Sequence, residues 1–303
     1  MVCKECTDKA VIILPENAKK LCKNHFIEYF ETKVFHTIAE HKLIGKKEHI
    51  VIALSGGKDS MSTLFLLHKL SEKNPQITLS ALLIDEGIAG YRPKTIEDAK
   101  HFCKEKKIPL HIASFKDLSG YDLDEILKRK KMHSCAVCGV FRRALLNEKA
   151  RELHATKLAT GHNLDDEAQS IFMNQITVNQ RRSKTLGPIT KNHIDERFIP
   201  RIKPLFFMTE KEITVYSLLK NFPVTYVECP YAPQDNLRND VRIAINTLEE
   251  KHPGTKHGIV NTFLKGIQSS TENHPVIGVC KVCFEPCAGE VCKKCVYLKE
   301  IKN

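Results

Sequence analysis

The chain has 303 residues, of which 42% are hydrophobic and 27% are charged, and its formal net charge is +11. At roughly 150 residues per domain, this length predicts one large core with one or two small modules and excludes a single small module. No apolar run approaches the ~18 residues that span a bilayer, so we expect no membrane contact, and the basic excess favours a polyanionic partner. Charged residues and cysteines come before any apolar stretch at the N-terminus, unlike in a signal peptide, so we expect a cytoplasmic protein.

The first cysteines form a compact set. Cys3 and Cys6 are one close pair, and Cys22 and His25 are a second. Three thiolates and one imidazole in this spacing are typical ligands of a tetrahedral zinc ion, and free or disulfide-linked cysteines are the alternative. We favour zinc, because a chain without a secretion signal rarely forms disulfides. The sequence therefore predicts a zinc finger over residues 1–30, leading into a helix that reaches about residue 46.

From residue 47 to residue 270, short apolar segments alternate with amphipathic ones. The periodicity predicts strands at 49–54, 79–84, 109–113 and 157–160, and helices at 61–70, 93–106, 140–153 and from about Asp165 onward. This alternation indicates an α/β fold with a doubly wound, parallel, Rossmann-like sheet, whose ligands bind outside the carboxyl ends of the strands.

Residues 55–60, Ser-Gly-Gly-Lys-Asp-Ser, lie between the first of these strands and its helix. Glycines let the backbone approach an anion, and the amides of a helix N-terminus favour phosphate, although a mere connecting turn is the alternative. The spacing differs from a Walker A loop and resembles the SGGxDS loop of the N-type ATP pyrophosphatases, which cleave ATP between its α and β phosphates and adenylate a substrate. The resemblance implies that ATP is bound by Ser55, Gly56, Gly57, Lys58, Asp59 and Ser60, with Asp59 holding Mg²⁺ and main chain near Ala53 and Ile84 holding adenine.

Residues 161–168, Gly-His-Asn-Leu-Asp-Asp-Glu-Ala, follow the strand expected at 157–160. Gly161 allows a close approach at a strand end, and the carboxylates that follow could cap the helix or hold Mg²⁺ beside a phosphate loop. The string resembles the GHNxDDxA segment of the tRNA-thiolating branch of these enzymes. That resemblance implies that Gly161 and Asp166 belong to the ATP and Mg²⁺ site, and we expect His162 to be positional.

The central cysteines are one short of a closed metal site. Cys135 and Cys138 form a CxxC pair just before the helix expected at 140–153, and Cys229 comes much later, before Pro230. Three thiolates can hold a cubane iron-sulfur cluster that leaves one iron for an outside ligand, and a CxxC pair at a helix start can instead carry a persulfide. A third possibility is stray zinc on the pair and a core position for Cys229.

The last cysteines again form two close pairs. These are Cys280 with Cys283 and Cys292 with Cys295, a spacing typical of a four-thiolate zinc ribbon, which we expect over residues 275–303. Cys287 lies between the pairs, and we expect it to be unliganded.

Taken in order, these motifs resemble the TtcA/TtuA family of tRNA thiolation enzymes, especially the archaeal and eukaryotic-type 2-thiouridine synthetases with two zinc fingers. The resemblance covers nearly the whole chain. It implies ATP-dependent adenylation of a tRNA uridine at C2 and replacement of its oxygen by sulfur, with release of AMP and pyrophosphate. It assigns catalytic roles to Asp59, Arg142, Asp166, Cys135, Cys138 and Cys229, the three cysteines holding a [4Fe-4S] cluster or relaying sulfur. A family member has Lys in place of Arg142; arginine keeps the charge but does not give up its proton, so we expect Arg142 to bind an anion or uridine.

The resemblance also implies partners. These are tRNA, a sulfur donor (a ubiquitin-like thiocarboxylate protein, a persulfide or free sulfide) and a second copy of the chain in a homodimer. The wobble uridine is favoured over the T-loop uridine as the target. Basic clusters at 128–131, at Arg181 and Arg182, and at Arg238 and Arg242 are candidates for phosphodiester contact.

Two other functional classes fit parts of the sequence. One is an adenylating enzyme of the same fold with another acceptor, such as an amidotransferase-type synthetase or a tRNA lysidine synthetase, neither of which needs the central cysteines. The other is a non-enzymatic zinc-bearing RNA-binding protein with a degenerate ATP loop. The presence of Asp59, Ser60 and Asp166 argues against the second class.

Overall fold

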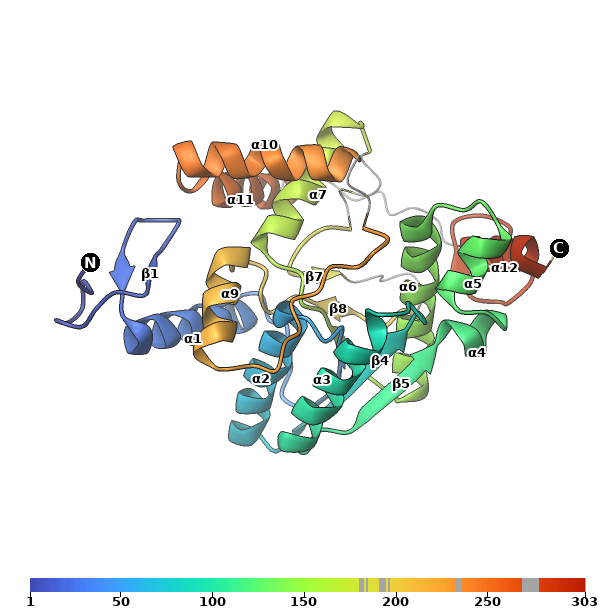
Figure 1. Cartoon of the computed structure of the whole chain (residues 1–303), viewed down its shortest axis with the longest axis horizontal. Helices are drawn as coiled ribbons and strands as arrows, with labels where there is room; N and C mark the ends of the chain where they lie inside the picture. Colours follow the sequence, from blue (N-terminus) through green and yellow to red (C-terminus); the bar gives the residue numbers. More distant parts are fainter. Residues whose placement is uncertain are drawn as a thin grey trace.

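A mostly parallel sheet lies at the centre of the molecule (Figure 1). The computed structural model describes residues 1–179, 183, 185–190, 195, 197–232, 236–268 and 278–302. Within these ranges the sheet has six strands in the order β5-β4-β3-β6-β8-β7, and only the edge strand β7 runs antiparallel to its neighbour. The strands are β3 (Glu48–Ala53), β4 (Ile77–Asp85), β5 (Leu110–Ser114), β6 (Lys157–Ala159), β7 (Ile189–Thr190) and β8 (Arg201–Ile202).

The strand order reverses beside β3. The chain passes from β3 to β4 and β5 on one side, and then returns to place β6 on the other side of β3. The reversal therefore falls between the carboxyl ends of β3 and β6, where an open α/β sheet leaves a crevice for ligands. Residues 55–60 follow β3 and residues 161–168 follow β6, so the fold brings both sequence motifs to this crevice.

Helices cover both faces of the sheet, because its strands bury side chains on both sides. Ile50 and Ile52 of β3 lie in one core, whereas Val51 between them lies in a second core on the opposite face. The first core is built with α1 (Lys23–Glu40), α2 (Lys58–Lys73), α3 (Arg92–Glu105) and α9 (Glu210–Leu219), and the second with α4 (Phe115–Ser119), α5 (Leu123–Arg129), α6 (Ser134–Glu152) and α12 (Lys293–Lys302). A doubly wound sheet is thus confirmed as the fold class.

A third, smaller core joins α7 (Leu164–Ile176) to α10 (Leu237–Lys251) and α11 (Thr255–Gln268). Val241 and Ile245 of α10 are buried at helical spacing and pack toward α7. In Figure 1 this group of three helices lies above the sheet. The helix that carries Asp166, α7, therefore packs against both α10 and α11.

Each end of the chain carries a small module with a two-stranded hairpin. The N-terminal module pairs β1 (Ile12–Ile13) with β2 (Lys20–Leu21), and the C-terminal one pairs β9 (Gly278–Val279) with β10 (Pro286–Cys287). Figure 1 shows them at opposite ends of the molecule. The C-terminal module packs on α6, where Tyr297 meets Phe141 with ring centroids 6.5 Å apart and Arg151 pairs with Glu285 at 2.6 Å.

The helix expected to reach about residue 46 ends at Glu40, because Lys42 has a φ of +49°, outside the helical range. The expected elements of the large domain are present, with one correction at α6. This helix begins at Ser134 and not at residue 140, so Cys135 and Cys138 lie inside its first turns and do not precede it. The physical reason is the pair Val137 and Phe141, which are both buried one helical turn apart and extend the apolar stripe toward the N-terminus.

Candidate functional site

The loop after β3 is held open by its own hydroxyl groups. The Ser55 N–H donates to Ser60 Oγ at 3.1 Å, the two hydroxyl oxygens lie 3.0 Å apart, and Ser60 Oγ donates to the Gly57 carbonyl at 3.0 Å. Gly57 is the N-cap of α2, and no side chain caps this helix with a hydrogen bond. The first backbone N–H groups of α2 can therefore bind an anion. The loop is therefore built as a phosphate cradle.

Gly56 allows this loop to lie against α3. Its φ is +84°, and a Cβ atom at this position would lie 2.5 Å from the carbonyl oxygen of Thr95. Any other residue would be strained in this conformation and would push the loop away from α3. The glycine is required by both the backbone conformation and the close contact.

Gly161 plays the corresponding part at the end of β6. A Cβ atom there would lie 2.9 Å from the Asp59 carbonyl carbon and from the Ser60 nitrogen. The absence of a side chain thus lets the segment after β6 touch the phosphate loop directly. Next to it, Asn163 donates from Nδ2 to Asp59 Oδ1 at 3.1 Å, and its backbone N–H donates to Asp166 Oδ2 at 3.3 Å. Asn163 therefore joins the two carboxylates that the sequence motifs offered for Mg²⁺.

The two carboxylates lie in different electrostatic surroundings. Burial raises the pKa of Asp59, while the ammonium of Lys58 and the amide of Asn163 oppose this, and the nearby Asp166 adds to it. Burial likewise raises the pKa of Asp166, which Arg238 opposes through an ion pair of 3.0 Å. Two carboxylates of raised pKa beside a phosphate cradle are suited to share a divalent cation, because such an ion replaces the protons that burial favours.

The other charged residues of the second motif have structural partners. Asp165 accepts the Glu210 N–H at 2.9 Å and pairs with Lys256, and Glu167 pairs with Lys203 at 2.7 Å. His162 donates to or accepts from Thr160 Oγ1 at 2.9 Å. Burial and the cations around it lower the pKa of His162 to about 3, so its imidazole is neutral at ordinary pH.

The central cysteines come together from two distant segments. Cys135 and Cys138 lie in the first turns of α6, and the loop after Cys229 contacts that turn through the Tyr231 carbonyl, 3.4 Å from Ser134 Oγ and 3.7 Å from Cys135 Sγ. Cys138 and Cys229 both pack against the second core. Their sulfur atoms do not form one of the tight four-ligand sets found in the described residues, and a cubane cluster needs a wider set than a single ion because its irons occupy separate corners. Three thiolates are ligands of the kind that iron-sulfur clusters take, so the chemistry of the donor set fits a cluster.

An unbroken chain of polar contacts links these cysteines to the phosphate loop. Arg142 donates to Cys138 Sγ at 3.2 Å and pairs with Glu86 at 2.7 Å. Glu86 also pairs with Arg92 at 2.5 Å, and Arg92 donates to the Ser55 carbonyl at 2.8 Å. The two halves of the site therefore meet at one buried carboxylate.

The two terminal cysteine sets are closed. In each set the four ligand atoms lie within 4.8 Å of one another; the sets are Cys3, Cys6, Cys22 and His25, and Cys280, Cys283, Cys292 and Cys295. Although burial opposes it, backbone N–H groups of Cys22, Glu5 and Cys6 lower the pKa of Cys3 to about 6. Such thiols ionise readily and fit tetrahedral zinc. Cys287 stands apart and donates to the Gly289 carbonyl at 2.8 Å.

The basic clusters have mixed outcomes. Arg238, expected to contact tRNA, pairs with Asp166, and Arg242 donates to Asn239 at 2.8 Å. Residues 128–131 span the end of α5 and the start of the short connection to α6. Arg181 and Arg182 lie outside the described residues. Of the adenine contacts expected, Ala53 ends β3, whereas the Ile84 carbonyl already accepts a hydrogen bond from Arg92 at 2.6 Å.

Three residues of this site were missed from the sequence. Glu86 and Arg92 flank the carboxyl end of β4, a position where α/β folds place site residues, but the positions of the strand ends alone do not reveal an ion pair. Asn163 lies within the motif at 161–168, but no role for it was expected from the sequence. Asparagine is a preferred N-cap residue, and its position just before α7 is the signal that could have identified it.

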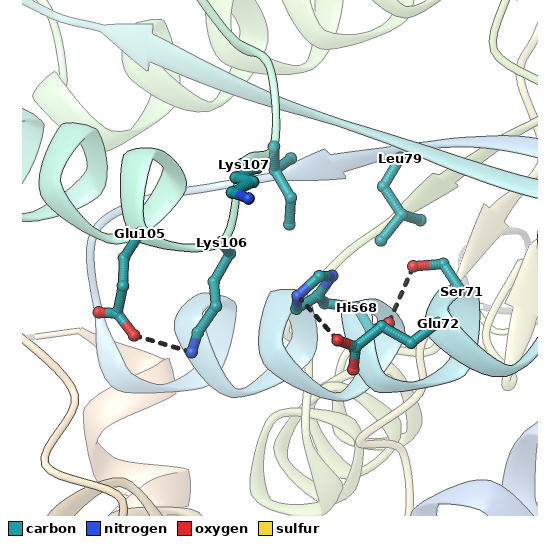
Figure 2. A pocket seen from close by; sticks show the side chains of 8 residues that line it. His68, Ser71, Glu72, Leu79, Glu105, Lys106 and Lys107 are labelled. Carbon is teal, nitrogen blue, oxygen red and sulfur yellow. Dashed lines mark hydrogen bonds and ion pairs between the residues drawn. The ribbon is translucent and has the colours of Figure 1, made fainter.

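A separate hollow of about 470 Å³ lies at the other end of the sheet (Figure 2). Its lining residues come from the last turns of α2 and α3, the segment after α3 and the start of β4. Two ion pairs lie in this lining, Lys106 with Glu105 at 2.8 Å and His68 with Glu72 at 3.8 Å. It is remote from the phosphate loop. In the described residues, no helix combines the length and apolar character needed to cross a membrane.

The fold and the loop after β3 define a PP-loop domain protein, and the chain matches the PP-loop domain family over residues 26–248. It is 38% identical over 299 residues to the tRNA-5-methyluridine(54) 2-sulfurtransferase of Pyrococcus horikoshii, covering 98% of this chain and 93% of that protein. It is 34% identical over 320 residues to the tRNA 2-thiolation protein NcsA of Haloferax volcanii, covering 100% of this chain and 99% of that one. The chain belongs to the PP-loop family of tRNA 2-thiolation proteins.

A solved structure supports the same assignment. The U34-tRNA thiolase NcsA of Methanococcus maripaludis, determined with its [4Fe-4S] cluster, has a TM-score of 0.84 and 34% identity to this chain, covering 99% of this chain and 96% of that one. The cytoplasmic tRNA 2-thiolation protein 1 of Drosophila grimshawi is 34% identical over 304 residues, covering 99% of this chain and 88% of that protein. The similarity therefore extends through both terminal modules.

Proposed function

We propose that this protein is an ATP-dependent tRNA sulfurtransferase that converts a tRNA uridine into 2-thiouridine. The observation that carries the proposal is the meeting of a phosphate loop and a three-cysteine centre in one site, through Arg142, Glu86 and Arg92. An adenylating enzyme with another acceptor needs only the first half of this site. Thiolation needs both, because one half activates oxygen as a leaving group and the other brings sulfur.

The reaction divides into two displacements. The C2 oxygen of uridine attacks the α phosphorus of ATP, and pyrophosphate leaves from the loop formed by residues 55–60. A sulfur nucleophile then adds at C2, and AMP leaves with the original oxygen. The guanidinium of Arg142 remains charged and orients the anionic α phosphate or the C2 oxygen, since arginine does not act as a proton donor in proteins.

The residues would hold their cofactors as follows. Asp59 and Asp166 would bind Mg²⁺ together with phosphate oxygens, and the two terminal sets would each bind one structural zinc ion. Cys135, Cys138 and Cys229 would hold a [4Fe-4S] cluster. When bound, such a cluster supplies one iron without a protein ligand, at which the sulfur to be transferred can bind.

Partners and boundaries follow from the same proposal. The basic run at 128–131 would contact the tRNA backbone, because it lies just before the helix that carries Cys135. We place the catalytic domain at residues 47–270, the zinc modules at 1–30 and 275–303, and the protein in the cytoplasm as a homodimer. The named relatives act at position 54 or position 34, and we retain the wobble uridine as the proposed target.

The test is thiolation of unmodified tRNA with ATP, Mg²⁺ and sulfide by anaerobically purified protein. We expect 2-thiouridine in the digested tRNA by mass spectrometry, with one AMP and one pyrophosphate per sulfur incorporated. Mapping the modified fragment to the anticodon or to the T-loop decides the position. Cys229→Ala protein that retained full product formation would support another acceptor class, and the absence of tRNA-stimulated pyrophosphate release would support a non-enzymatic RNA-binding protein.

A further inference from the structure

Glu86 is the most deeply buried charged side chain of the site. It is 0% exposed, and its backbone is held on both sides of the turn that follows β4. The Glu86 carbonyl accepts the Leu123 N–H at 2.8 Å, and Asp85 Oδ1 accepts the Gly87 N–H at 2.9 Å. These bonds hold the backbone at Glu86, and two ion pairs place its carboxylate between the phosphate loop and the cysteine centre.

One oxygen of this carboxylate faces the phosphate loop through Arg92. Arg92 is itself buried and pairs with Glu86 Oε2 at 2.5 Å. Its guanidinium donates to the Ser55 carbonyl at 2.8 Å and to the Ile84 carbonyl at 2.6 Å. Arg92 thus connects the proposed ATP loop to the end of β4. Glu86 balances the charge of this guanidinium and orients it.

The other oxygen faces the cysteines through Arg142. Arg142 pairs with Glu86 Oε1 at 2.7 Å and donates to Cys138 Sγ at 3.2 Å, one helical turn before it on α6. This carboxylate therefore lies between the phosphate loop and Cys138.

Charge alternates along this chain of groups. From the loop outward it runs Arg92 positive, Glu86 negative and Arg142 positive, and Arg142 reaches Cys138 Sγ. Glu86 therefore has to satisfy two cations in a site where unbalanced charge is costly.

We propose that Glu86 is a positioning residue that couples ATP binding at the phosphate loop to occupancy of the cysteine centre. The inference rests on the proposed function for the identity of both ligands. The two guanidinium groups share one carboxylate, so when Arg142 is engaged by an occupied cysteine centre, Glu86 is left to hold Arg92 more firmly. Arg92 then fixes Ser55 in the position that receives phosphate. By reciprocity, ATP bound at the loop favours cluster retention by the same factor.

The experiment compares the Kd for ATP with Mg²⁺ in apo protein and in protein reconstituted with iron and sulfide, measured anaerobically by calorimetry. We expect cluster-loaded wild-type protein to bind ATP about fivefold more tightly or better, the lower end of typical coupling between sites. In Glu86→Gln the ratio of the two Kd values should fall to about one. Glu86→Asp, which keeps the charge, should restore most of the coupling.

The matched control is Glu48→Gln. Glu48 is also a buried glutamate in an ion pair, with Lys157 at 3.4 Å, but it lies at the opposite end of β3 from the loop. This variant should keep the wild-type ratio. If Glu86→Gln does not fold, Arg142→Ala removes the contact between Glu86 and Cys138 from its more exposed partner. This variant should also bring the ratio of the two Kd values to one.

Three results would overturn the inference: a wild-type ratio of one, an unchanged ratio in Glu86→Gln or in Arg142→Ala, or an equal loss in the Glu48 control. These results are independent of tRNA thiolation. If ATP and iron bind and are coupled but no 2-thiouridine forms, the proposed function fails and the coupling stands. If 2-thiouridine forms but the wild-type ratio is one, the reverse holds.

Discussion

The terminal and the central cysteine sets differ in how far apart in the sequence their members lie. Each terminal set brings four ligand atoms within 4.8 Å of one another from a single short segment. The central set draws Cys135 and Cys138 from α6 and Cys229 from a loop that follows much later, and this loop reaches the helix through the Tyr231 carbonyl. A closed local site is suited to hold structure, whereas an open site assembled by the fold can present a metal to a substrate.

The comparison also explains their surroundings. In the C-terminal set, the pKa of Cys280 is lowered to about 6, chiefly because the Cys292 N–H of the same module donates to Cys280 Sγ at 3.3 Å. Burial raises the pKa of Cys138, and the charge that opposes this comes from Arg142, which is tied to the ATP side. The electrostatic surroundings of the central cysteines are thus set by residues of the catalytic domain outside the cysteine segments.

The largest expected effect comes from removing a central cysteine. Cys138→Ala or Cys229→Ala should lower 2-thiouridine formation by about 10³-fold or more, because three ligands are the minimum for holding the cluster. Zinc content should remain at wild-type level, since neither terminal set is touched. Mass spectrometry of digested tRNA and elemental analysis for iron and zinc measure both. Loss of zinc along with activity would show that the central set is not independent.

Breaking a terminal set should instead cost one zinc ion and local order. Cys22→Ala and Cys292→Ala should each remove one of two zinc ions and expose the affected module to limited proteolysis, because such modules depend on metal for folding. Iron retention should fall further in Cys292→Ala than in Cys22→Ala, since the C-terminal module packs on α6. Equal iron retention in both variants would show that the packing of this module does not matter to the central set.

The ion pair between the C-terminal module and α6 tests that packing directly. Arg151 binds Glu285 through two hydrogen bonds of 2.6 and 3.1 Å at a partly exposed position. Glu285→Gln should lower the free energy of unfolding by about 1 kcal/mol and leave both zinc ions in place. Thermal unfolding at low and high salt measures this, and the difference from wild type should shrink at high salt because the pair is screened. A salt-independent difference would point to packing instead of charge.

A second effect on folding stability alone concerns α1, the helix that carries Cys22 at its N-cap and His25 in its first turn. Burial alone would raise the pKa of Glu31, but hydrogen bonds from Lys69, Tyr216 and Lys220 hold it below its usual value of 4.5. Glu31→Gln should cost ~1–2 kcal/mol at pH 7 without loss of zinc.

The sign of its pH dependence follows from the lowered pKa. The contribution of Glu31 is fully present above pH 4.5 and is lost as the pH falls through the folded-state value below it. Unfolding of wild type and Glu31→Gln should therefore converge in acid. A difference that stayed constant from pH 7 to pH 3 would contradict this origin.

Much of the large domain was predictable from the sequence, because its signals are local. The strand at Glu48–Ala53, the loop at 55–60 and the helix after it appear where apolar periodicity and paired glycines predict them. The start of α6 was wrong by about two turns, because the contact of Val137 and Phe141 with the second core, and not helix propensity alone, sets that boundary.

The sequence by itself determined the closed sites and the phosphate loop. The ligands of each terminal set and the hydroxyls of the loop lie within one short segment, so the spacing along the chain already constrains their positions in space. Only the tertiary structure decided that Cys229 meets α6, that Arg238 pairs with Asp166, and that Glu86 joins Arg92 to Arg142. These contacts join segments from separate strands and helices, and only the packing of the sheet and its two cores brings such segments together.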